Sequence, residues 1–233
     1  MATSNSSPYA PSLSDEEIMA SLRARVRSRM DGATAAAMRA SGVDYAYNFG
    51  LSIPQLRDLA SELPSRLSLA QKLLSAQLRE MRILGLLSFP AETLTYSQAI
   101  SFAKSLETEE LLSLFSTHLL AKNENVVACF PKGESLRVQR VWLNALSRRL
   151  LENFPTSGLA QAIETTLERL SAQPETLSVT EMDWLERLYN NEEWTEQISP
   201  ALRSWMQLPE EHPLRNVASD LLSQTYPKRL PRI

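Results

Sequence analysis

The chain has 233 residues, of which 43% are hydrophobic and 22% are charged, and its formal net charge is −3. This apolar content is too high for a disordered chain, and no window approaches the roughly 18 uncharged residues of a membrane span. Only 6 glycines are present, against about sixteen at average usage, so Rossmann and P-loop enzymes with their glycine-rich phosphate loops are not expected. One cysteine and two histidines exclude an internal disulfide, a zinc ribbon and a histidine-rich metal site, and we predict neither metal nor cofactor.

The composition favours an all-α fold, because leucine, alanine, glutamate and arginine are abundant and β-branched residues are sparse. Helical periodicity recurs from Leu13 to Tyr226. Ser14, followed by three acids, is typical of a helix N-cap, and Ser52 with Pro54 predicts a second capped helix. A short alanine-rich helix is expected between residues 32 and 42. Further helices are expected at residues 67–74, 78–89, 97–106, 107–122, 134–153, 157–172, 180–189, 192–206 and 214–226, with a loop at residues 123–133.

We expect these helices to form HEAT- or armadillo-like antiparallel pairs stacked into a curved α-solenoid, since the pairs recur at intervals of roughly 35–45 residues. A compact irregular bundle is the alternative. No change in composition marks a boundary, so residues 13–226 are predicted to form a single domain. Residues 1–12 are expected to be a flexible tail without the pattern of a signal peptide, which predicts a cytoplasmic protein, and residues 227–233 are expected to be a basic tail.

Two segments resemble a known family. The sequence Tyr-Asn-Phe-Gly-Leu-Ser-Ile-Pro-Gln-Leu-Arg-Asp-Leu-Ala at residues 47–60 follows Met-Arg-Ala-Ser-Gly at residues 38–42. This combination of a Phe-Gly turn and a Pro-x-x-Arg helix resembles the DNA alkylation repair proteins of the AlkD-like group. Gln-Leu-Arg-Glu-Met-Arg at residues 77–82 is similar to that family's second helix pair, and residues 138–143 are a weaker match. The resemblance implies HEAT-like repeats with a concave basic surface for duplex DNA, and a glycosylase that excises N3- and N7-alkylated purines.

One helix departs from the catalytic pattern of that family. Active members carry a tryptophan followed four residues later by an aspartate, and Leu112 and Ser116 occupy these places in the equivalent segment of this chain. A serine cannot carry the negative charge that stabilises a developing sugar cation. We therefore predict no catalytic residue, while the family's active-site arginine corresponds to Arg140.

The candidate DNA contacts lie in and just before the expected helix at residues 134–153. They are Lys132, Arg137, Arg140, Asn144 and Arg148. The last four recur at offsets of three, seven and eleven residues, which places them on one side of a helix. Arginine binds phosphate oxygens bidentately, so this stripe predicts contacts to a nucleic-acid backbone. The alternative is a solvated helix face with ion pairs to Glu134 or Glu152.

Three other features have alternative interpretations. The alternating arginines at positions 23, 25, 27 and 29 split on a helix into two pairs on different sides, and either one pair lines a DNA groove or all four form a solvated face. The four tryptophans, at positions 142, 184, 194 and 205, are predicted to fill the core rather than to stack on a base. Cys129 is predicted to be a buried, inert thiol.

These patterns predict a DNA-binding protein of the alkylation repair type, whose partner is duplex DNA, alkylated or intact, and not a membrane. The alternative is a non-catalytic helical-repeat scaffold that binds a protein or a peptide. The net negative charge and the missing tryptophan–aspartate pair favour this alternative, because helical solenoids commonly serve as interaction surfaces.

Overall fold

The computed structural model describes residues 9, 12–43, 45–152 and 158–223. These residues form helices and connecting turns and contain no β-strand, so the fold is all-α, as predicted. Contacts divide the chain into two compact units, Met1–Asn123 and Glu124–Ile233, here called unit 1 and unit 2. Compact units are not necessarily separate domains, so the single domain stays a prediction. No helix among the described residues is long and apolar enough to cross a bilayer.

Both predicted tails fall largely outside the described residues. The structure describes only Tyr9 and Ser12 of residues 1–12, and none of residues 227–233. Residues 153–157, where the sequence predicts that one helix ends and the next begins, are likewise not described. Within the described part of the chain, no group of three or more histidine, cysteine, aspartate or glutamate side chains is arranged to hold a metal ion.

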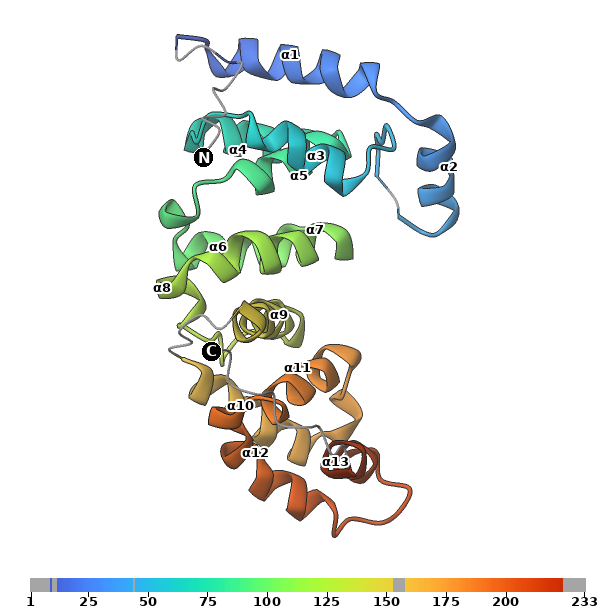
Figure 1. Ribbon diagram of the computed structural model, residues 1–233, viewed down its shortest axis with the longest axis vertical. Helices are drawn as coiled ribbons and strands as arrows, with labels where there is room; N and C mark the ends of the chain where they lie inside the picture. The colour runs from blue at the N-terminus through green and yellow to red at the C-terminus, as the bar shows by residue number, and fades with distance from the viewer. Residues whose placement is uncertain (1–8, 10–11, 44, 153–157, 224–233) are drawn as a thin grey trace, which may run out of the picture. The chain divides into compact units, whose positions relative to one another are not determined.

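Unit 1 consists of α-helices joined by short turns (Figure 1). Its helices are α1 (Asp15–Ser28), α2 (Gly32–Ala40), α3 (Ile53–Ser61), α4 (Leu67–Leu74), α5 (Arg79–Ser88), α6 (Tyr96–Ser105) and α7 (Glu109–Leu114), with a 3-10 turn η1 (Ala91–Thr93). Ser14 and Ser52 cap α1 and α3 as predicted, each in a capping box. The predicted helix at residues 107–122 is interrupted, because α7 continues as a π-helical turn η2 (Phe115–Leu119) and a 3-10 turn η3 (Leu120–Lys122).

Helix α5 is the centre of unit 1 and packs against α3, α4 and α7. Gly85 permits the close approach of α4, since a Cβ atom at this position would lie 2.8 Å from the Leu74 backbone nitrogen. The helix begins with two buried charges, Arg79 and Glu80. The Arg79 guanidinium donates to both carboxylate oxygens of Glu110 and to the Leu51 carbonyl oxygen. Arg79 therefore links the loop before α3 to α7 at the N-terminal end of α5.

The Glu80 carboxylate holds the same loop from inside. It accepts hydrogen bonds from the backbone N–H groups of Phe49, Gly50 and Leu51 at 3.0–3.3 Å. Gly50 has a φ of +82°, and a Cβ atom there would lie 2.2 Å from the Asp31 carbonyl oxygen. The turn thus requires glycine both for its left-handed conformation and for its contact with the start of α2.

The half-buried Glu110 gives unit 1 a dependence on acid pH. Burial raises the pKa of this carboxyl group, but hydrogen bonds from Arg79 and Tyr45 outweigh burial and hold the pKa below its ordinary value of 4.5. A lowered folded-state pKa contributes stability above the unfolded-state pKa, and this stability is lost as the pH falls through the folded-state value.

We expect Glu110→Gln to lower the free energy of unfolding by about 1.5–3 kcal/mol at pH 7, the range of hydrogen bonds to charged groups. The difference from the wild type should shrink as the pH falls below about 4.5, because the wild-type carboxylate then takes up its proton. Urea denaturation followed by circular dichroism measures this difference. The exposed neighbour Glu109, changed to glutamine, is the control. A difference that stays constant down to pH 3 would show that this carboxylate is not the titrating group.

Unit 2 begins with a short helix inside the segment that the sequence predicts to be a loop. Its helices are α8 (Glu124–Val127), α9 (Leu136–Glu152), α10 (Leu159–Ala172), α11 (Val179–Tyr189), α12 (Glu192–Trp205) and α13 (Pro213–Ser223), with a 3-10 turn η4 (Pro174–Thr176). Cys129 is exposed, so the prediction of a buried thiol is wrong. Its neighbours Val127 and Phe130 fill the interior instead, and its thiol contacts the Asn125 carbonyl oxygen at 3.4 Å.

The core of unit 2 contains three of the four tryptophans, as predicted. Trp142, Trp184 and Trp205 are buried, whereas Trp194 is half-buried. The Trp142 indole nitrogen donates to the Val126 carbonyl oxygen at 3.4 Å. Helix α11 packs against α9, α12 and α13. The face of α9 that does not meet this core is therefore the face that remains available for contacts.

Candidate nucleic-acid interface

The predicted cationic stripe lies on the least buried side of α9. Arg137 and Arg148 are exposed and Arg140 and Asn144 are half-buried, while buried residues flank this stripe on both sides. Lys132, in the turn before the helix, is exposed. The 3.6-residue period of the helix thus brings together on one face the four residues that the sequence spacing selects. We call these four residues and Lys132 the α9 stripe.

Arg140 is held in place by α11 and by the turn before it. Its Nε donates to Glu181 at 3.1 Å, and one Nη donates to the Thr176 carbonyl oxygen at 2.7 Å. The side chain of Glu181 is completely buried, whereas 32% of the Arg140 side chain is exposed. Glu181 and the Thr176 carbonyl oxygen therefore orient the guanidinium from its buried side. Its other terminal nitrogen, Nη1, makes no hydrogen bond within the described residues.

A second arginine shares the same buried carboxylate. Arg169 of α10 donates to Glu181 Oε1 at 2.7 Å and to the Thr176 hydroxyl. Glu181 also accepts from the backbone N–H and the hydroxyl of Ser178, which completes the capping box of α11. Two guanidinium groups thus surround one carboxylate, and the cluster carries one net positive charge. That charge is favourably placed for an anion at the exposed edge of Arg140.

Two other cations of the stripe, Arg148 and Lys132, lie close to acids. Arg148 donates to Glu152. This acid is one of the two that the sequence predicts as ion-pair partners if the stripe is only a solvated face. Lys132 lies 3.9 Å from Glu168, and both side chains are more than half exposed. Ion pairs between exposed groups contribute little stability, because solvent and salt screen them. A phosphate group can therefore replace either acid at a small energetic cost.

Sequence reasoning misses Arg169, Thr176 and Glu181. These residues lie 29 to 41 positions after Arg140 in the chain, so helical spacing cannot connect them to the stripe. A signal was nevertheless present, because Ser178 and Glu181 have the spacing of a capping box. The capping box predicts that the Glu181 carboxylate points back toward Ser178. It does not predict that two arginines also bind this carboxylate.

The segment that the resemblance places opposite the family's catalytic helix is part of the interior of unit 1. Leu112 is 5% exposed and Ser116 is completely buried. The Ser116 hydroxyl donates to the Ser113 carbonyl oxygen at 3.0 Å. Neither side chain faces solvent, so no surface site forms at these two positions.

Comparison with known proteins adds no relative to these observations: no family model, no curated protein sequence and no solved structure matches the chain.

Proposed function

We propose that the chain binds the sugar–phosphate backbone of duplex DNA through the α9 stripe, with its helices stacked in HEAT-like antiparallel pairs. The observation that carries this proposal is the cluster of Arg140, Arg169 and Glu181, which holds an excess positive charge at a partly exposed guanidinium. An arginine that is already oriented loses less conformational entropy when it binds a phosphate. The packing of successive helices, such as α4 on α5 and α11 on α12, supports the repeat arrangement.

The proposal concerns recognition and assigns excision chemistry to no residue. The resemblance to DNA alkylation repair proteins, which includes the Phe-Gly turn and the Arg79–Glu80 pair, is the basis for proposing an alkylated purine as the recognised feature. Excision would require a carboxylate beside the sugar. The residue at the position equivalent to that carboxylate, Ser116, is buried and uncharged.

The proposal is tested by titrating labelled duplex DNA, with and without an N3- or N7-alkylated purine, at two salt concentrations. Backbone binding should weaken steeply with salt, because each phosphate contact releases counterions. Abasic sites are assayed in every sample. Binding without abasic sites would support recognition alone, whereas abasic sites would show excision that depends on a residue other than Ser116. Binding that does not change with salt would overturn the proposal.

Arg140→Gln is expected to weaken duplex binding about tenfold at low salt, and to lower the slope of log Kd against log salt by about 1. Glu181 keeps its bonds from Arg169 and Ser178 in this variant, so the fold should persist. Arg187→Gln is the matched control, because Arg187 is also paired with an acid and 28% of its side chain is exposed. Equal weakening in the two variants would contradict the role of Arg140.

A second candidate function, binding of a protein partner, is favoured by exposed apolar side chains on α11. Val179 is 80% exposed and Met182 is 45% exposed, and the two lie three positions apart on the same helix. Exposed apolar side chains that lie together often mark a surface that a protein partner covers. Loss of a protein partner on Val179→Ser/Met182→Ser, with duplex binding absent at both salt concentrations, would favour this function over DNA binding.

A further inference from the structure

Unit 1 contains a second group of arginines, most of which have no partner among the residues that the structure describes. Between Arg23 and Ser41 the chain has five arginines and a single acid, Asp31. The guanidinium groups of four of these arginines make no hydrogen bond or ion pair within the described residues. They are Arg23, Arg27, Arg29 and Arg39, all of them exposed, and we call them the α1–α2 arginine surface.

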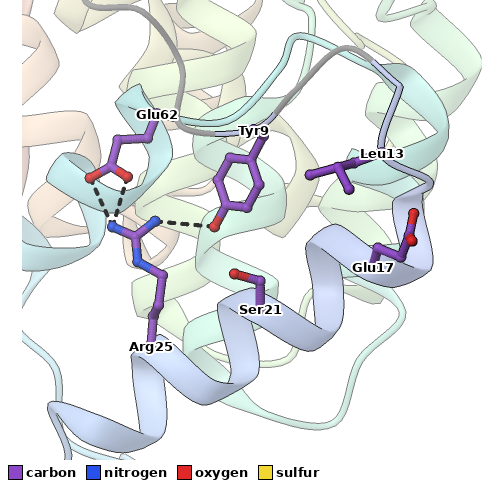
Figure 2. Close-up of a pocket in the computed structure, with 6 residues that line it drawn as sticks. All are labelled: Tyr9, Leu13, Glu17, Ser21, Arg25 and Glu62. Atoms are coloured by element: carbon purple, nitrogen blue, oxygen red, sulfur yellow. Dashed lines mark hydrogen bonds and ion pairs between the residues drawn. The ribbon is translucent and has the colours of Figure 1, made fainter.

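The fifth arginine shows the contrast. Figure 2 shows the Arg25 guanidinium between the hydroxyl of Tyr9 and the carboxylate of Glu62. It donates to the hydroxyl at 3.1 Å and lies 2.7 Å from the carboxylate. Arg25 is thus part of a contact between the start of the chain, α1 and the end of α3, and it is not available to a ligand. The alternating arginines therefore divide into one with a structural role and three that have no partner in the described part of the chain.

The geometry of α1 separates the two kinds of arginine. Ile18, Leu22 and Val26 are its buried residues. At 100° per residue, Arg23 and Arg27 lie on one flank of this buried stripe, and Arg25 lies on the other. Arg23 and Arg27 are one turn apart, or about 6 Å along the axis. They therefore form a pair directed away from the core of unit 1.

No acidic group among the described residues forms an ion pair with Arg23 or Arg27. The three acids of α1 lie in its first turn, at the other end of the helix. The Asp31 carboxylate is engaged as the N-cap of α2, where it accepts from the N–H groups of Ala33 and Thr34 at 3.0 Å. Cations near a helix C-terminus also interact favourably with the helix dipole, but that effect is confined to the last turn. Arg23 lies outside that turn, so the helix dipole does not explain why an arginine occupies this position.

Helix α2 is fixed to the core of unit 1, although few of its own residues are buried. The Asp31 N–H donates to the Phe49 carbonyl oxygen at 2.8 Å, and the adjoining Gly50 turn is held by the buried Glu80. Its outer face carries small side chains, which allow the backbone of a partner to approach closely. They are Ala33, Ala36, Ala37 and Ala40, all of them exposed. Arg39 therefore extends from a helix whose position is fixed, and the alanines on the outer face of that helix do not block access to it.

We propose that the Arg23–Arg27 pair of the α1–α2 arginine surface binds phosphate groups of duplex DNA, in addition to the α9 stripe. The proposal rests on the proposed function for the identity of the polyanion. Unpaired arginines with few large apolar neighbours complement a regular array of phosphates, which recur about every 3.4 Å along the axis of each strand. Met30, 57% exposed, is the one large exposed apolar residue that lies among these arginines in the chain. Two arginines one turn apart can meet two phosphates of one strand.

The test compares two variants of the full chain that lose the same charge. Arg23→Gln/Arg27→Gln removes the α1 pair, and Lys104→Gln/Arg203→Gln removes two exposed cations from α6 and α12. Fluorescence anisotropy with a labelled 20-base-pair duplex gives Kd over a series of salt concentrations. We expect the first variant to bind about tenfold or more weakly at low salt, with a salt slope lowered by about 2. The control should bind within twofold of the wild type.

The outcomes separate this inference from the proposed function. If the wild type binds in a salt-dependent manner and the two double variants bind alike, the Arg23–Arg27 pair is excluded while DNA binding stands. If the wild type does not bind duplex DNA at either salt concentration, both proposals fail. Vesicles containing phosphatidylserine form a third arm. Binding to these vesicles, lost in Arg23→Gln/Arg27→Gln, with no binding to duplex DNA, would assign the pair to a membrane and overturn the inference.

Discussion

Glu80→Ala is expected to lower the free energy of unfolding of unit 1 by about 3–5 kcal/mol, the range found when one partner of a buried charge pair is removed. The carboxylate is completely buried and accepts from three consecutive backbone N–H groups as well as from Arg79. Alanine leaves these donors without acceptors inside the protein, and unsatisfied buried donors are costly. Urea denaturation followed by far-ultraviolet circular dichroism measures the loss.

Glu107→Ala is the matched control for this prediction. Glu107 also pairs with an arginine, Arg82, at 3.0 Å, but 76% of its side chain is exposed. Exposed ion pairs contribute at most about 1 kcal/mol, because water and salt screen the charges. Equal losses in the two variants would mean that Glu80 does not hold the loop at residues 49–51.

Glu181→Ala should cause a loss of similar size in unit 2, about 3–5 kcal/mol. This substitution leaves Arg140 and Arg169 without their shared carboxylate, and only 12% of the Arg169 side chain is exposed. It also removes half of the capping box of α11. All four tryptophans lie in unit 2, so tryptophan fluorescence during urea denaturation reports on this unit.

The control for Glu181→Ala lies on the same helix. Asp183 pairs with Arg187 four residues later at 2.8 Å, and 44% of the Asp183 side chain is exposed. Asp183→Ala should therefore cost less than about 1 kcal/mol. If both variants unfold at the same urea concentration, the buried cluster does not stabilise unit 2, and Arg140 is not oriented by Glu181.

The proposals for DNA binding are compatible with the negative net charge of the chain. Net charge governs long-range attraction and solubility, whereas a phosphate contact depends on the charges within a few ångströms of it. The acids of α1 gather in its first turn, while Arg23 and Arg27 follow later in the helix. Two of these first-turn acids, Asp15 and Glu16, also form salt bridges with Lys72.

The positions of the helices, and the face that α9 exposes, could be predicted from the sequence alone. Capping boxes at Ser14 and Ser52 involve residues three positions apart, and the stripe on α9 follows from the period of one helix. Each of these features depends on interactions within a few residues.

Only the tertiary structure decided which charges are engaged. Arg140 meets Glu181 across 41 positions, and Arg25 meets Glu62 across 37 positions, so no helical spacing predicts either pair. The same holds for the exposure of Cys129 and for the change from α7 to a π-helical turn, both of which depend on how neighbouring segments pack. Local hydrogen bonds and side-chain periodicity determine where this chain is helical. Burial and charge pairing arise between residues tens of positions apart, and they determine which arginines remain available to a ligand.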